Sequence, residues 1–166
     1  MKILDELKLQ VRAACGADGL ADYFHILLME GQLKRVLEIV RVRPDALAGL
    51  LPVVANPEAS MNVRFGAGAV FENQAGTPAL RALVDRLGEL SAHVDARVRA
   101  DACHYLGLSA DGEARRFLEI RLSDDNEEVC EIAAESLAAI AKASGSQGYN
   151  RSDPAPAAPE RNRRDG

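Results

Sequence analysis

Apolar residues recur along this chain at the spacing of an α-helix. Leu80, Leu83, Val84 and Leu87 follow the i, i+3, i+4, i+7 pattern, and the same pattern begins again at Val129. Side chains three and four positions apart share one face of a helix, so each such segment should bury one face. The pattern predicts helices over residues 2–15, 20–30, 32–41, 46–55, 61–73, 78–90, 96–108, 113–122 and 127–142.

Capping residues and prolines separate these segments. Thr77 is expected to be an N-cap, with Pro78 at the first helical position. Pro52 lies inside its segment, where it should kink or restart the helix. Residues 144–166 contain almost nothing apolar, so we expect residues 1–143 to form one domain that a disordered tail follows.

One motif occurs three times along the chain, at a spacing of about 33 residues. It reads VRFGAGAVFE from Val63, VRADACHYLG from Val98 and VCEIAAESLA from Val129. Each copy has an alanine four positions after its valine and a large apolar residue four positions further on. Self-similarity at this period is typical of units that cannot bury their apolar face alone and therefore stack on their neighbours. The repeat predicts an all-α fold.

These motifs resemble those of the HEAT-repeat family, in which each unit is a pair of antiparallel helices. The resemblance covers about residues 32–142 and is closest in LSDDNEEV, from Leu122, with the IAAESLAAI that follows. It implies a right-handed superhelical α-solenoid of about four helix pairs behind an N-terminal helical cap. Residues 20–140 are also similar to the HEAT module fused behind thioredoxin-like domains in some bacterial proteins, which implies a partner from a redox or complex-maturation system.

In the HEAT family, an acidic residue six positions before the arginine of the Val-Arg pair helps to form a ladder of ion pairs between units. Glu58 and Asp124 occupy this position in the first and last copies, and His93 occupies it in the middle copy. Cys130 replaces the arginine of the last copy. The resemblance therefore implies that the last unit lacks this pair and acts as a C-terminal cap.

Composition narrows the possible classes of function. Only 4% of the residues are aromatic, which favours closely packed helices over a β-sandwich, and the net charge of −5 provides no general basic field for nucleic acid. Cys15, Cys103 and Cys130 form no C-x-x-C pair and indicate a reducing compartment. The longest uncharged apolar stretch, residues 46–55, is too short to span a membrane. We expect a cytoplasmic protein that binds neither nucleic acid nor membrane.

Few residues offer catalytic or metal-binding chemistry. The GAG run from Gly66 resembles part of a phosphate-binding loop, but it lacks the preceding strand and the third glycine, so close helix packing explains it better. Cys103 and His104 point about 100° apart on one helix and cannot act on each other as nucleophile and base. Together with Cys130 they could supply zinc ligands, although their spacing matches no compact zinc module. The sequence predicts no enzyme, no cofactor and no metal site.

The second helix of each pair provides the predicted binding surface. In a HEAT-type solenoid these helices line the concave face, where partners usually dock. Stacking is expected to gather a mixed-charge strip on this face, composed of Arg81, Asp85, Arg115, Arg116 and Glu119. An ordinary solvated face would show the same pattern.

We therefore expect a non-catalytic adaptor or assembly scaffold that binds another protein on its concave face. One alternative is a prosthetic-group lyase or chaperone, because HEAT-like relatives include proteins that attach bilins to phycobiliproteins. Another is a DNA-base repair enzyme of the HEAT-like glycosylase type, which the short length, the acidic charge and the absence of tryptophan disfavour. The sequence predicts neither the partner's identity nor the oligomeric state.

Overall fold

The computed structural model describes residues 17–147, and every regular element in that range is helical. The all-α expectation is confirmed for these residues, whereas the helix predicted over 2–15 and the tail from 148 onward lie outside them. The elements are α2 (Ala17–Met29), α3 (Leu33–Val42), the 3-10 helix η1 (Pro44–Leu50), α4 (Leu51–Val54), α5 (Met61–Asn73), α6 (Pro78–Arg81), α7 (Val84–Leu90), α8 (Ala96–Leu108), the 3-10 helix η2 (Gly112–Ala114), α9 (Arg115–Arg121) and α10 (Glu127–Gln147).

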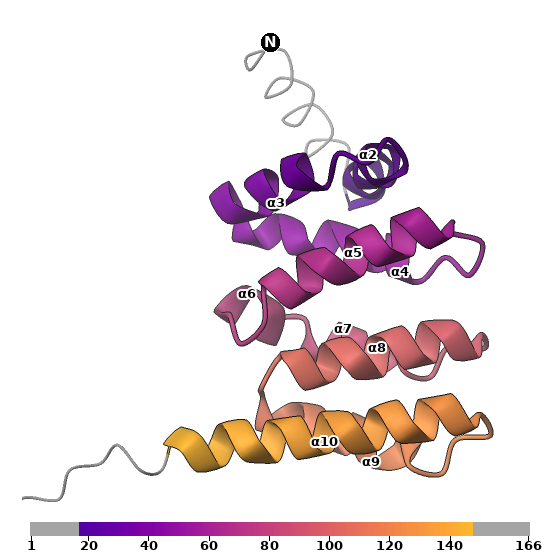
Figure 1. Ribbon diagram of the computed structural model, residues 1–166, viewed down its shortest axis with the longest axis vertical. Coiled ribbons are helices and arrows are strands. Elements are labelled where there is room, and N and C mark those ends of the chain that lie inside the picture. Colours follow the sequence, from indigo (N-terminus) through magenta and orange to yellow (C-terminus); the bar gives the residue numbers. More distant parts are fainter. Residues whose placement is uncertain (1–16, 148–166) are drawn as a thin grey trace, which may run out of the picture.

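The helices are arranged in layers along the long axis of the molecule. Figure 1 shows α5, α8 and α10 lying one below the other on the near side, with α4, α7 and α9 behind them. Each long helix contacts the short helix of its own layer, and α8 contacts both α5 and α10. The short helices α7 and α9 therefore lie on the side of the molecule opposite the long helices.

Equivalent positions of the three sequence motifs face the interior. The valine and alanine of every copy are buried, and the large apolar residue is buried in the first two copies and half-buried in the third. These positions are Val63, Ala67 and Phe71, then Val98, Ala102 and Leu106, then Val129, Ala133 and Leu137. All of these positions except Val98 and Ala102 lie in or against one apolar core, which extends through the layers.

Side-chain caps fix the beginnings of the long helices. The Ser60 hydroxyl accepts a hydrogen bond from the N–H of Val63 at the start of α5, and Asp95 accepts one from the N–H of Arg97 at the start of α8. Thr77 caps α6 through the N–H of Leu80, at 3.3 Å, as predicted. Both α5 and α8 have the bounds that the sequence predicted, because a cap and a helical apolar pattern agree there.

The prediction of one continuous helix over residues 78–90 is wrong. The chain turns at Leu83, whose φ of −99° and ψ of 0° depart from helical values. The N–H of Leu83 donates to the carbonyl of Leu80, three residues back instead of four, which tightens the turn between α6 and α7. Leu83 and Val84 are both buried at this break, so the chain keeps its apolar face inward on either side of it.

Two further segments also differ from a single α-helix. The segment predicted over 46–55 divides into η1 and α4. Pro52 lies in the first turn of α4, so the helix restarts at this proline, which is one of the two outcomes that the sequence predicted. Residues 112–114 form a 3-10 turn before α9. At the other end, α10 continues to Gln147, beyond its predicted end at Lys142 and past the domain boundary predicted after residue 143. None of the helices in the described range is long and apolar enough to cross a bilayer.

Candidate functional site

The short helices α7 and α9 bring part of the predicted charged strip together. A guanidinium nitrogen of Arg116 on α9 donates to Asp85 Oδ1 on α7 at 2.6 Å. Arg115 and Glu119 form a second ion pair within α9, at 3.5 Å. All four side chains are at least half exposed, so these pairs contribute little to stability and remain accessible to another molecule.

Arg81, the fifth residue of the predicted strip, has a different neighbour. Its Nε donates to the backbone carbonyl of Ser109 at 3.3 Å, at the end of α8. The side chain therefore links α6 to the turn after α8. The structure joins α7 to α9 through Asp85 and Arg116, while Arg115 pairs within its own helix.

Two apolar side chains complete the surface between α7 and α9. Ile120 is 60% exposed, and the half-buried Phe117 lies against α7 at Gly88. A Cβ atom at Gly88 would lie 2.4 Å from Phe117 Cε1, so the ring can approach α7 only because residue 88 lacks a side chain. The guanidinium of Arg116 lies 4.6 Å from the centroid of the Phe117 ring, within cation–π distance.

These residues line a hollow of about 460 Å³ that we name the α7–α9 hollow. Its lining residues are Asp85, Glu89, Arg116, Phe117 and Ile120. The charged strip predicted from the sequence includes neither Phe117 nor Ile120. The signal was nevertheless present, because Ile120 follows Arg116 by four positions and so shares its exposed helix face.

Two further hollows adjoin the α7–α9 hollow through shared residues. One, of about 210 Å³, shares Glu89 and extends toward α4. The other, of about 410 Å³, shares Ile120 and extends to the Arg99 side chain. Their other lining residues are Leu51, Pro52, Ala55, Arg86 and Leu90 in the first, and Ala92, His93, Arg121, Ser123, Asp124 and Asp125 in the second. The α7–α9 hollow thus shares one lining residue with each of the other two.

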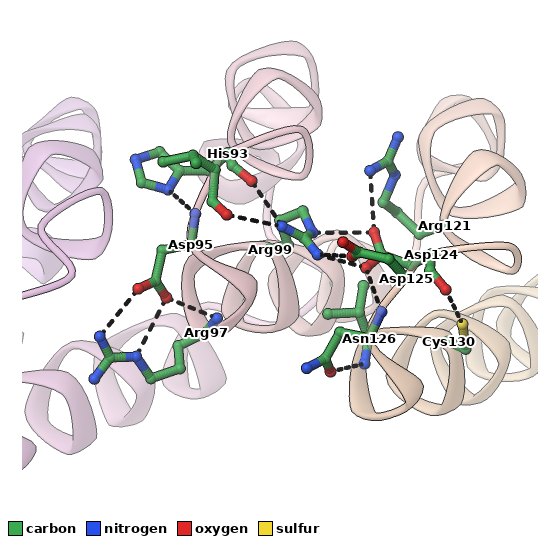
Figure 2. A network of polar contacts seen from close by, with 11 residues as sticks. His93, Asp95, Arg97, Arg99, Arg121, Asp124, Asp125, Asn126 and Cys130 are labelled. Atoms are coloured by element: carbon green, nitrogen blue, oxygen red, sulfur yellow. Dashed lines mark hydrogen bonds and ion pairs between the residues drawn. The ribbon is translucent and has the colours of Figure 1, made fainter.

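Arg99 is the centre of the polar network shown in Figure 2. Its Nε and Nη2 donate to the two carboxylate oxygens of Asp124, at 3.0 and 2.6 Å, in bidentate geometry. Its Nη1 donates to the backbone carbonyls of His93 and Val94, and Nη2 also contacts Asp125. The network ties the first turn of α8 to the turn that precedes α10.

Burial and charge act in opposite directions on Asp124. Burial disfavours its ionised form, but hydrogen bonds from Arg99 and from the N–H of Asn126 outweigh this and lower its pKa to about 2. The hydrogen bond to Asp124 in turn raises the pKa of Arg99. This side chain is therefore fully charged although only 9% of it is exposed. Arg121 also donates to the Asp124 carboxylate, at 3.1 Å.

The other members of the expected ion-pair ladder follow a different arrangement. Arg64 has His93 at the position where the next unit would supply an acid, and it pairs instead with Asp101 of α8, at 2.8 Å. The thiol of Cys130, which replaces the last arginine, donates to the backbone carbonyl of Asp124, at 3.3 Å.

Comparison with protein-family models, with curated proteins and with solved structures gives no match.

Cys103, His104 and Cys130 have separate surroundings. Burial raises the pKa of the Cys103 thiol to about 12, which disfavours the thiolate that a nucleophile or a metal ligand needs. His104 is exposed, and its Nε2 lies 3.8 Å from Glu72 Oε1. Within residues 17–147, no three His, Cys, Asp or Glu side chains converge in a way that could hold a metal ion.

A second partly apolar surface lies between α2 and α5. Met29 and Phe65, which are 60% and 69% exposed, line a hollow of about 480 Å³ together with buried Leu28. This surface carries no ion pair between its helices comparable to Asp85–Arg116 among the described residues. It provides a useful comparison surface on a different part of the molecule.

Proposed function

We propose that this chain is a non-catalytic protein-interaction module, an adaptor or assembly scaffold that holds a partner protein on the face formed by α7 and α9. The observation that carries the proposal is the α7–α9 hollow, where exposed Ile120 and half-buried Phe117 adjoin the exposed Asp85–Arg116 pair. An exposed apolar centre with a polar rim is the arrangement that protein interfaces use.

The layered arrangement supports a right-handed α-solenoid of HEAT-type helix pairs as the framework of this module. Each long helix lies in front of a shorter one in successive layers (Figure 1), and the two are in contact. Equivalent motif positions are buried in these layers. In such a framework α4, α7 and α9 would line the concave face. A preorganised surface of this kind loses little conformational freedom when it binds, which favours recognition.

Binding is a better match than catalysis for the side chains on this face. The lining of the α7–α9 hollow contains carboxylates, one guanidinium and two apolar side chains. Arg116 forms an ion pair with Asp85, so the charges of these two residues neutralise each other. They do not converge on a point where a substrate atom could react. A partner surface can use the same groups as a polar rim.

Affinity capture with two matched variants tests the proposal. Ile120→Asp places a charge in the α7–α9 hollow, and Phe65→Asp makes the same change on the exposed surface of α5. After both variants are shown to be folded by circular dichroism, each serves as bait in a lysate of the source organism. We expect wild type and Phe65→Asp to retain the same protein, and Ile120→Asp to lose it.

The captured protein should then be purified and its affinity measured by calorimetry. Ile120→Asp should weaken binding by about tenfold or more, which corresponds to about 1.4 kcal/mol. Retention by Ile120→Asp together with loss by Phe65→Asp would place the binding surface on α5 and contradict the proposal.

A further inference from the structure

We infer that the segment bound on the α7–α9 face carries a lysine or arginine between apolar residues, and that this cation pairs with Glu89. The inference rests on the proposed function and specifies the chemistry of the partner. It follows from the one charge in the α7–α9 hollow that has no partner among the described residues, together with the shape and lining of the surface around it.

Glu89 gives the hollow its net charge. Asp85 and Arg116 neutralise each other at 2.6 Å, whereas the Glu89 carboxylate makes no ion pair or side-chain hydrogen bond with any residue between 17 and 147. The Glu89 side chain is exposed on α7, so it is available to a ligand. A cation is therefore the complementary group for this position.

The position of Glu89 adds a shape requirement. It lines both the α7–α9 hollow and the smaller hollow toward α4, so apolar side chains lie on either side of it. Phe117 and Ile120 are on one side, and Pro52 and Leu90 are on the other. Lysine and arginine bury an aliphatic stem along apolar surface while their charged end reaches a polar group, which is what this lining accommodates.

An acidic segment would be disfavoured on the same surface. Arg116 is already paired with Asp85 and lies over the Phe117 ring, so the α7–α9 hollow has no unpaired cation to offer. Arg86 lines only the smaller hollow. A carboxylate or phosphate placed in the larger hollow would face Glu89, and juxtaposed like charges oppose binding.

Selection from a random peptide display library on the immobilised full-length protein tests this inference. The selected peptides are expected to share a lysine or arginine with apolar residues on both sides. A synthetic peptide of that sequence should bind Glu89→Lys and Ile120→Asp about tenfold or more weakly than wild type. Glu113→Lys, the same change at an exposed carboxylate on η2, should bind it as wild type does.

Each other result would overturn the inference in a recognisable way. The selected peptides could depend on Ile120 but lack a basic residue and bind Glu89→Lys normally. That result would overturn the inference that the bound segment carries a cation, and would leave the proposed binding face intact. Enrichment of no peptide, or of peptides indifferent to both variants, would also overturn the inference and leave the proposed function to the capture experiment.

The chain's own four arginines in residues 148–166 are a competing source of the cation. A full-length variant with these arginines changed to glutamine distinguishes the two sources. Unchanged affinity for the selected peptide is expected. Markedly tighter binding by this variant would show that the chain's own arginines compete for Glu89, and would overturn the assignment to a separate partner.

Discussion

Arg99 and Asp124 form the most buried ion pair among the described residues, with side-chain exposures of 9% and 2%. A buried pair of this kind is no more stabilising than well-packed apolar residues, but removal of one partner leaves an uncompensated charge in the interior. Each guanidinium nitrogen of Arg99 donates to at least one acceptor, in Asp124, in Asp125 or in the backbone carbonyls of His93 and Val94. The pair therefore fixes how α8 lies on the layer that contains α10.

Asp124→Asn should lower the free energy of unfolding by about 3 kcal/mol, because Arg99 keeps its charge but loses the charged partner that compensates for its burial. Urea denaturation at neutral pH measures this loss. Asp125→Asn is the matched control, since Asp125 also contacts Arg99 but its side chain is 89% exposed. If the two variants lose the same stability, the buried geometry of Asp124 is not what matters.

Acid should weaken this part of the fold in a defined pH range. The pKa of Asp124 is lowered from 3.8 to about 2 in the folded chain, so above pH 4 the carboxylate is ionised in both states and its stabilisation is complete. As the pH falls from about 4 to about 2, the unfolded chain takes up the proton first, and the stabilisation is lost. Urea denaturation across this range should show a steeper fall for wild type than for Asp124→Asn. Parallel curves would contradict the assignment.

Helix packing depends on positions where a residue lacks a side chain. Gly88 of α7 lies under the ring of Phe117 from α9, and Gly66 of α5 lies under Leu28 from α2. In each case a Cβ atom would approach the neighbouring side chain to 2.7 Å or less. Gly66 and Gly88 thus permit close approach of helices, as the sequence interpretation expected for the GAG run. Gly68, the other glycine of that run, does not, because a Cβ atom there would lie 3.5 Å from Tyr105 Oη, an ordinary contact.

Gly88→Ala should destabilise the chain by about 2 kcal/mol, because the added methyl group forces the Phe117 ring away from α7. Gly112→Ala is the control: a Cβ atom there meets nothing within 4 Å, so stability should change by no more than about 0.5 kcal/mol. Thermal melts of both variants provide the comparison. A Gly88→Ala variant as stable as wild type would show that Phe117 does not pack where the structure places it.

Local signals explain which elements could be predicted from the sequence. In α5 and α8 the cap, the helical apolar pattern and the absence of a competing turn all agree, and the predicted bounds are those observed. The break at Leu83 has no such signal, since residues 78–90 read as one amphipathic helix. Only contacts with other layers can favour the turn, so propensity and periodicity could not reveal it.

The candidate site was only partly predictable, for a reason that belongs to the whole molecule. The helix pattern correctly places Asp85 and Arg116 outside, but which charges meet depends on how α7 and α9 are stacked. Arg99 and Asp124 are likewise 25 positions apart and come together only through that stacking. Glu89 is left without an ion-pair partner among the described residues because Asp85 and Arg116 pair with each other. The pattern of a single helix cannot show this.

The C-terminal residues make a separate test at the scale of the whole molecule. Removal of residues 148–166 should leave the melting temperature within about 2 °C of wild type, because that segment has few apolar side chains to bury. A chain that ends before Ile140 is the control, since Ile140 is 1% exposed and belongs to the core. It should melt at a clearly lower temperature. A large drop for the first deletion would show that those residues dock on the helical body.

Hydrogen exchange of the full-length protein, measured by mass spectrometry with and without the captured partner, tests the central claim most directly. Binding on the α7–α9 face should slow amide exchange in residues 84–90 and 115–121, and leave exchange in α2 and α5 unchanged. Slowing confined to α2 and α5, around Met29 and Phe65, with no change in α7 and α9, would contradict the account.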